Sequence, residues 1–236
     1  MAEIQLPGLE TIVTLWSWAT SQGSIFPEVW ADPRSYFETF KQRGQNPLPT
    51  AISFFSFIVL LQAIIEFPLA MVVLKYDPLQ ISTIIILIIT AVLQAGVFSF
   101  AMFILARVLG SKASLGDTLA SMLFATVYTP LLSVRSYVAF IDPNFVRNFA
   151  TGDKLIENLP LDGFVIANIL ITASIYIYIT CKIIPLVKAV HRFGLARAIT
   201  SFGAAAITWL IFISVVMRPI AKQLIQTGGL ALSWIG

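Results

Sequence analysis

The sequence predicts an all-α membrane protein: a polytopic bundle of five transmembrane helices preceded by N-terminal amphipathic interfacial helices. Hydrophobic residues make up 58% of the chain and charged residues only 11%, whereas about a quarter of a soluble domain is charged. No charge occurs from Pro78 to Ala106. Within that run, 81–105 exceeds the roughly 20 apolar residues that cross a bilayer as a helix. Four further apolar stretches follow the same pattern.

Charge and hydropathy divide the chain into three regions. Residues 1–48 form a cytoplasmic or interfacial amphipathic segment, 49–217 form the five-helix domain, and 218–236 form a C-terminal tail. The five spans are expected at about 50–74, 81–108, 118–134, 164–187 and 198–217.

The connections between these spans differ in length. The short connection at 75–78 predicts an antiparallel hairpin of the first two spans, and 136–163 is the longest polar stretch between spans.

The N-terminal segment predicts two helices. In residues 1–20 an apolar stripe through Val13 and Trp16 has helical spacing. This helix suits either the lipid headgroup boundary or packing on the rest of the protein. A second, short helix is indicated by an N-cap at Asp32, a proline at its first position and Gly44 at its end. Its expected interface anchors are Trp30, Arg34, Phe37, Phe40, Lys41 and Arg43.

The cations predict the orientation, because Lys and Arg are enriched on the cytoplasmic side. With a cytoplasmic N-terminus and an external C-terminus, the inner set outnumbers the outer one. The inner set is Arg34, Lys41, Arg43, Arg107, Lys112, Lys182, Lys188, Arg192 and Arg197, and the outer set is Lys75, Arg135, Arg147, Lys154, Arg218 and Lys222. The bacterial inner membrane is the expected location.

One carboxylate, Glu66, lies within a predicted span. A charge in lipid is costly and is a functional-site hypothesis by default. Pro68 frees a backbone carbonyl one turn earlier, and the amides of Gln62 and Gln94 are the expected inward partners. These three side chains form the candidate intramembrane polar site. The alternative is that the amides serve packing, as small residues do in the second and fifth spans: Ala91, Ala95, Ser99, Ser201, Gly203 and Ala205.

Several functions are not indicated by the residues. The net charge of +3 is too small to favour nucleic acid binding, and the single cysteine, Cys181, gives no Cys-based metal site. No cofactor is expected, because phosphate-loop and hydrolase motifs are missing and 110–112 lacks the required glycine spacing. The one histidine, His191, is expected at the surface among cations.

Three features of the chain resemble the Yip1 family, especially its prokaryotic members. They are the amphipathic segment 30–40 leading into the first span, the Gly- and Lys-containing stretch 109–119, and Tyr128-Thr-Pro130 in the next helix. The resemblance covers about 28–217. Eukaryotic members are linked to vesicle traffic and bind small GTPases through a longer N-terminal region. Nothing here matches that region, so GTPase binding is not carried over.

The sequence therefore favours a non-catalytic membrane protein that acts as a scaffold or assembly subunit. Its expected partners are membrane lipids and other integral membrane proteins, or a second copy of itself. The alternative function is a small-solute or ion transporter or permease subunit that uses Glu66. A membrane enzyme is not expected, because the interface lacks clustered His, Asp or Glu.

Overall fold

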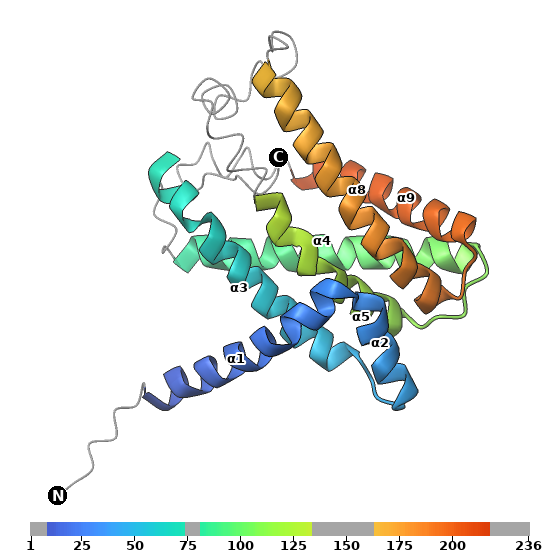
Figure 1. Cartoon of the computed structure of the whole chain (residues 1–236), viewed down its shortest axis with the longest axis horizontal. Helices are drawn as coiled ribbons and strands as arrows, with labels where there is room; N and C mark the ends of the chain where they lie inside the picture. The colour runs from blue at the N-terminus through green and yellow to red at the C-terminus, as the bar shows by residue number, and fades with distance from the viewer. Residues whose placement is uncertain (1–8, 74–80, 134–162, 218–236) are drawn as a thin grey trace, which may run out of the picture.

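A computed structural model of the chain describes residues 9–73, 81–133 and 163–217 (Figure 1). Within these ranges the chain forms helices and no strands, and five helical segments are long and apolar enough to cross a membrane. The predicted all-α multi-pass class is therefore confirmed. In chain order the elements are α1 (Leu9–Ala31), α2 (Pro33–Gln42), α3 (Leu48–Val73), α4 (Ile81–Val108), α5 (Leu115–Ala125), η1 (Thr126–Tyr128), α8 (Gly163–His191), α9 (Leu195–Phe212) and the π-helical turn η2 (Ile213–Met217).

The N-terminal segment has one long helix where the sequence suggested a helix ending near residue 20. α1 continues to Ala31 and bends into α2 at Asp32. The Asp32 carboxylate accepts hydrogen bonds from the backbone N–H groups of Arg34 and Ser35, at 3.0 and 3.2 Å. These bonds satisfy donors that have no partner within the first turn of a helix. The predicted N-cap is confirmed.

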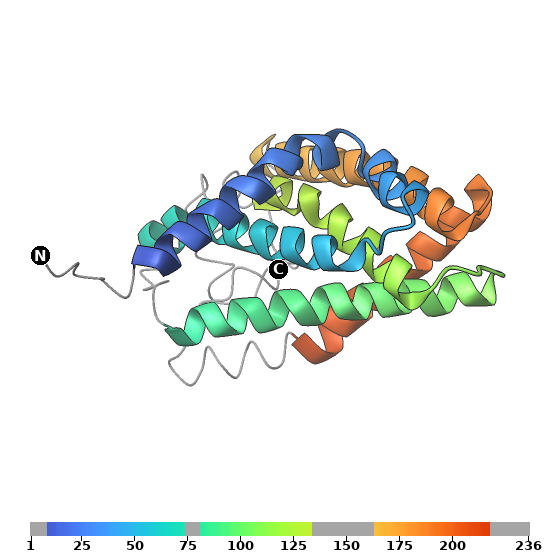
Figure 2. The ribbon, with the colours of Figure 1, turned by 90° about the horizontal axis from the view of Figure 1, so that it is seen from below.

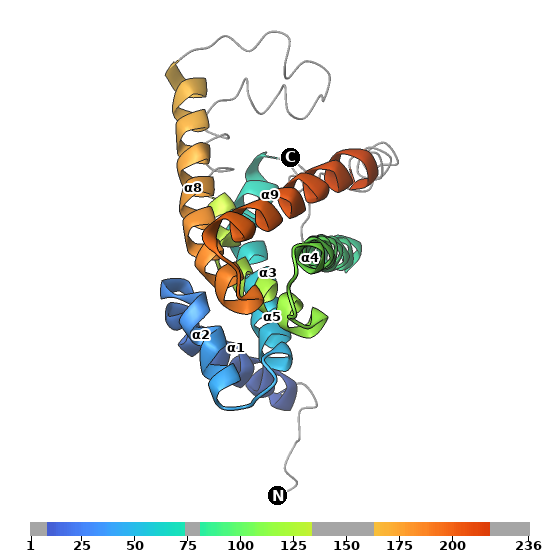
Figure 3. The ribbon, with the colours of Figure 1, turned by 90° about the vertical axis from the view of Figure 1, so that its right-hand side faces the viewer.

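The helix α5 is the centre of the molecule. Half of Leu115–Ser133 is buried, against 17% of each of the other four spans. It packs against α2, α3, α4 and α8, and Figure 3 shows it among α3, α4 and α8. Thr118 and Ser121 are fully buried there, and their hydroxyls donate to carbonyls of the preceding turn. Small and hydroxyl side chains let neighbouring helices approach closely in a membrane.

The chain tightens into the 3₁₀ turn η1 just before Pro130. Proline has no N–H, so the Thr126 carbonyl loses its usual helical donor. The Thr129 hydroxyl donates to that carbonyl at 2.7 Å. The Thr129 backbone N–H also donates to it, so the carbonyl is satisfied at the 3₁₀ turn, before the helix resumes at 129–133.

The most extensive helix pair is α4 with α9. Ser99 of α4 and Ser201 and Ala205 of α9 are buried, and the rings of Phe98 and Phe202 meet edge to face between the two helices, with centroids 5.7 Å apart. The predicted role of small residues in close packing fits this arrangement. Figure 2 shows α4 on one side of the molecule, with α1 and α2 on the other.

The expected antiparallel hairpin of the first two spans is replaced by a different packing. α3 packs mainly on α5, whereas α4 packs mainly on α9 and α5. The two helices are therefore not each other's main partners, because α5 takes the position between them. Their connection, 75–78, lies outside the described residues, as do the polar stretch 136–162 and the tail 218–236.

Candidate functional site

Three connections meet at one end of the helices, and we call this region the loop junction. They are the α2–α3 connection (43–47), the α4–α5 connection (109–114) and the α8–α9 connection (192–194), at the lower right of Figure 1. In a chain that crosses a membrane five times, every second connection lies on the same side. The three connections of the junction are spaced in this way. The helices and connections that meet there carry the nine cations assigned from the sequence to the cytoplasmic side.

A buried hydrogen bond joins two of these connections. Ser111 Oγ lies 2.8 Å from His191 Nδ1, and His191 is only 3% exposed. The prediction that His191 is a surface residue is therefore wrong. Its neighbours Lys188 and Arg192 are exposed. The imidazole instead contacts Ser111 of the α4–α5 connection and stacks on the Phe193 ring.

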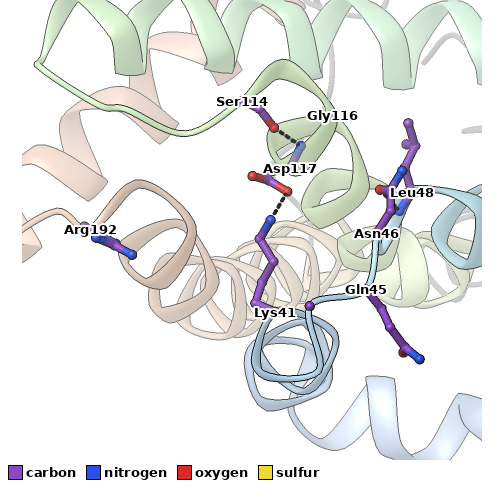
Figure 4. A pocket seen from close by; sticks show the side chains of 9 residues that line it. Lys41, Gln45, Asn46, Leu48, Ser114, Gly116, Asp117 and Arg192 are labelled. Carbon is purple, nitrogen blue, oxygen red and sulfur yellow. Dashed lines mark hydrogen bonds and ion pairs between the residues drawn. The ribbon is translucent and has the colours of Figure 1, made fainter.

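An ion pair joins α2 to the first turn of α5. Lys41 Nζ lies 2.7 Å from Asp117 Oδ1, and the Asp117 N–H donates to the Ser114 side chain, which caps α5. The pair lines an open groove of about 600 Å³, which we call the loop groove (Figure 4). Its polar lining residues are Lys41, Gln45, Asn46, Ser114, Asp117 and Arg192.

The end of α1 is clamped to the spans by three hydrogen bonds. Trp18 Nε1 donates to Ser53 Oγ at 2.8 Å, the Tyr128 hydroxyl donates to the Trp30 carbonyl at 2.9 Å, and Lys182 Nζ donates to the Ala31 carbonyl at 2.8 Å. The last two acceptors lie at the negative end of the α1 dipole, which favours a cation. This explains how Lys182 is accommodated in a span.

The predicted interface anchors divide by burial. Phe37 is 3% exposed and belongs to the core, so it has no surface to offer to lipid. Trp30 and Phe40 are partly buried and pack on that core, next to the rings of Tyr128 and Phe124 respectively. These three aromatic residues hold α2 on the protein, and the cations Arg34, Lys41 and Arg43 remain exposed.

The predicted intramembrane polar site is only partly described. Glu66 belongs to α3, and its side chain lies outside the described part. Gln62 and Gln94 are half-buried. They come from α3 and α4, which are not main packing partners. The role of these three residues stays a prediction.

Sequence reasoning missed the contributions of Ser111, Asp117 and Arg192. The available signal was Gly44 and Gly110, since glycine often marks the residue just past a helix end and so locates the connections that form the junction. No group of three His, Cys, Asp or Glu that could hold a metal occurs among the described residues.

Fold and site together define a multi-pass helical membrane protein whose spans are joined by a polar loop junction. Comparison with known proteins finds no matching family model, no similar curated protein and no similar solved structure.

Proposed function

We propose that this protein is a non-catalytic scaffold or assembly subunit of a membrane complex, and that α1 is the arm through which it contacts other integral membrane proteins. The observation that carries the proposal is the contrast between two parts of α1. From Trp18 to its C-terminal end the helix is clamped through Trp18, Trp30 and Ala31. The part before Trp18, residues 9–17, extends away from the spans (Figure 1).

The part of α1 before Trp18 carries large apolar side chains. Trp16 is 72% exposed and Val13 59%, and Leu15 is exposed beside them. These exposed side chains support a role of the helix outside the described core, rather than packing of its apolar stripe on the rest of the described chain. An exposed apolar helix face that is held at a fixed angle can bind in a hydrophobic groove of a partner protein.

The orientation belongs to the same proposal. The helices and connections that meet at the loop junction carry the larger cation set, so we place the junction on the cytoplasmic side of a bacterial inner membrane, with the C-terminus outside. A reporter fused after Gly236 is expected to be exported. The resemblance of 28–217 to the Yip1 family supports a multi-pass protein of this kind and adds no site residue.

Photo-crosslinking in native membranes tests the proposal. A photoreactive residue at Trp16 is expected to give protein adducts of discrete mass, either with another membrane protein or with a second copy of this chain. The matched control is Ile207 of α9, which is also strongly exposed and is expected to give lipid adducts alone. Lipid adducts alone from position 16 would contradict the proposal and leave α1 as a lipid-bound helix.

A further inference from the structure

Three helices of the loop junction end in the same kind of left-handed turn. In each, a residue just past the helix donates its N–H to the carbonyl five residues earlier: Gln45 to the Phe40 carbonyl, Ser111 to the Ala106 carbonyl and Phe193 to the Lys188 carbonyl. The residue before each donor has a positive φ. It is Gly44 at +65° in the first turn and Gly110 at +90° in the second, but Arg192 at +54° in the third.

Arg192 is the exception that needs a reason. A positive φ is comfortable for glycine and strained for a residue with a Cβ. Strained residues of this kind cluster at functional sites, where the side chain is needed. No ion pair of Arg192 occurs among the described residues, and its side chain is exposed. Arg192 lines the loop groove, on the side facing the Lys41–Asp117 pair (Figure 4).

The charges in the loop groove favour an anion. Lys41 and Arg192 come from different elements, and Asp117 is the single opposing carboxylate. Gln45 and Asn46 are uncharged residues that also line the groove. An arginine beside a lysine matches a phosphate, because the guanidinium donates two parallel hydrogen bonds and the ammonium adds a point charge.

The apolar surface beside the groove favours a phospholipid headgroup over free phosphate as the bound group. We propose that the loop groove binds the headgroup of an anionic phospholipid. Leu48 lines it at the start of α3, and Leu115, between the groove residues Ser114 and Gly116, is 44% exposed. Apolar surface of two spans thus begins at the edge of the groove, where the acyl chains of a bound lipid would lie. This binding is independent of any protein partner on α1.

Native mass spectrometry of the detergent-purified protein tests this site. The probes are phosphatidylglycerol and phosphatidylcholine with the same acyl chains. The wild-type protein is expected to retain phosphatidylglycerol preferentially. Arg192→Gln is expected to weaken that retention about tenfold, as for the loss of a charge-assisted hydrogen bond. The matched control, Arg43→Gln, removes the same charge from an exposed residue next to Gly44 that does not line the groove, and is expected to change little.

Two more variants keep the test independent of folding. Arg192→Gly relieves the strained backbone, so it is expected to melt no lower than wild type and still to lose phosphatidylglycerol. Asp117→Asn removes the opposing carboxylate and is expected to strengthen retention. Equal losses of phosphatidylglycerol retention in Arg43→Gln and Arg192→Gln would overturn the site, because they would show that the lipid is held by general charge attraction to this end of the protein. Displacement of the lipid by inorganic phosphate at millimolar concentration would overturn the assignment to a lipid.

Discussion

Ser111 and His191 lie 80 residues apart in the chain and share a hydrogen bond of 2.8 Å in the loop junction. The Ser111 hydroxyl oxygen also accepts from the Ala113 N–H at 3.1 Å. A hydroxyl oxygen has two acceptor lone pairs, so Ser111 Oγ can still either donate to His191 Nδ1 or accept from it, depending on the tautomer of the ring. Nε2 is buried and has no hydrogen-bond partner among the described residues. The bond thus ties the α4–α5 connection to the end of α8.

Ser111→Ala is expected to lower the free energy of unfolding by about 1–3 kcal/mol, since it leaves a buried imidazole nitrogen unsatisfied. The double variant Ser111→Ala/His191→Phe is expected to lose less than the single one, because it removes both polar partners. Thermal unfolding in detergent, followed by circular dichroism, measures both. Ser56→Ala is the control, since the Ser56 hydroxyl is exposed and donates within its own helix. A double variant less stable than Ser111→Ala would show that the unsatisfied imidazole does not cause the loss.

Asp32→Ala is expected to destabilise α2 by about 1 kcal/mol, because it removes the N-cap. Partial burial alone raises the Asp32 pKa, but hydrogen bonds from Ser35 and Arg34 and the charge of Arg34 outweigh it, so the pKa lies below its ordinary value of 3.8. The stabilisation by the carboxylate is therefore complete above about pH 4 and is lost as the pH falls through the lowered pKa.

Unfolding measured as a function of pH checks this sign. The gap between wild type and Asp32→Ala should narrow below about pH 4, the ordinary carboxyl range. Asp32→Asn is the matched control, since asparagine caps a helix as well as aspartate does. Its stability should stay close to that of wild type at neutral pH. A gap that widens toward low pH would show that the carboxylate does not stabilise the cap.

Tyr128→Phe is expected to loosen the junction of α1 and α2. The Tyr128 side chain is buried and its hydroxyl donates to the Trp30 carbonyl, so removal of the hydroxyl should cost about 1 kcal/mol. Hydrogen exchange of the backbone around Asp32 should become faster, whereas α9 should be unaffected. Tyr176→Phe serves as the control because Tyr176 is exposed on α8. Equal exchange in both variants would remove Tyr128 from the clamp.

Ala205→Leu is expected to separate α4 and α9. Ala205 is fully buried, and extra methylenes in a packed core cost about 1–3 kcal/mol. The same change at the exposed Ala196, also on α9, should be neutral. Thermal unfolding in one detergent compares the two variants. A neutral Ala205→Leu would mean that the α4–α9 contact tolerates a wider spacing than the structure shows.

The sequence alone determined the features that arise from local interactions. The span predicted at 81–108 has the bounds of α4. An uncharged apolar segment forms a helix across the lipid and ends close to the first charged residue, here Arg107. The start of α2 follows from Asp32 and Pro33, and its end from Gly44, because caps satisfy the backbone within a few residues.

Only the tertiary structure decided which helix is central and which polar residues meet. Nothing in the chain near His191 places Ser111 beside it, and nothing near Lys41 places Asp117 there. All five spans are apolar enough for lipid, so hydropathy cannot tell which of them the others surround. The central position went to α5, whose small and hydroxyl side chains, such as Thr118 and Ala120, allow four helices to approach it.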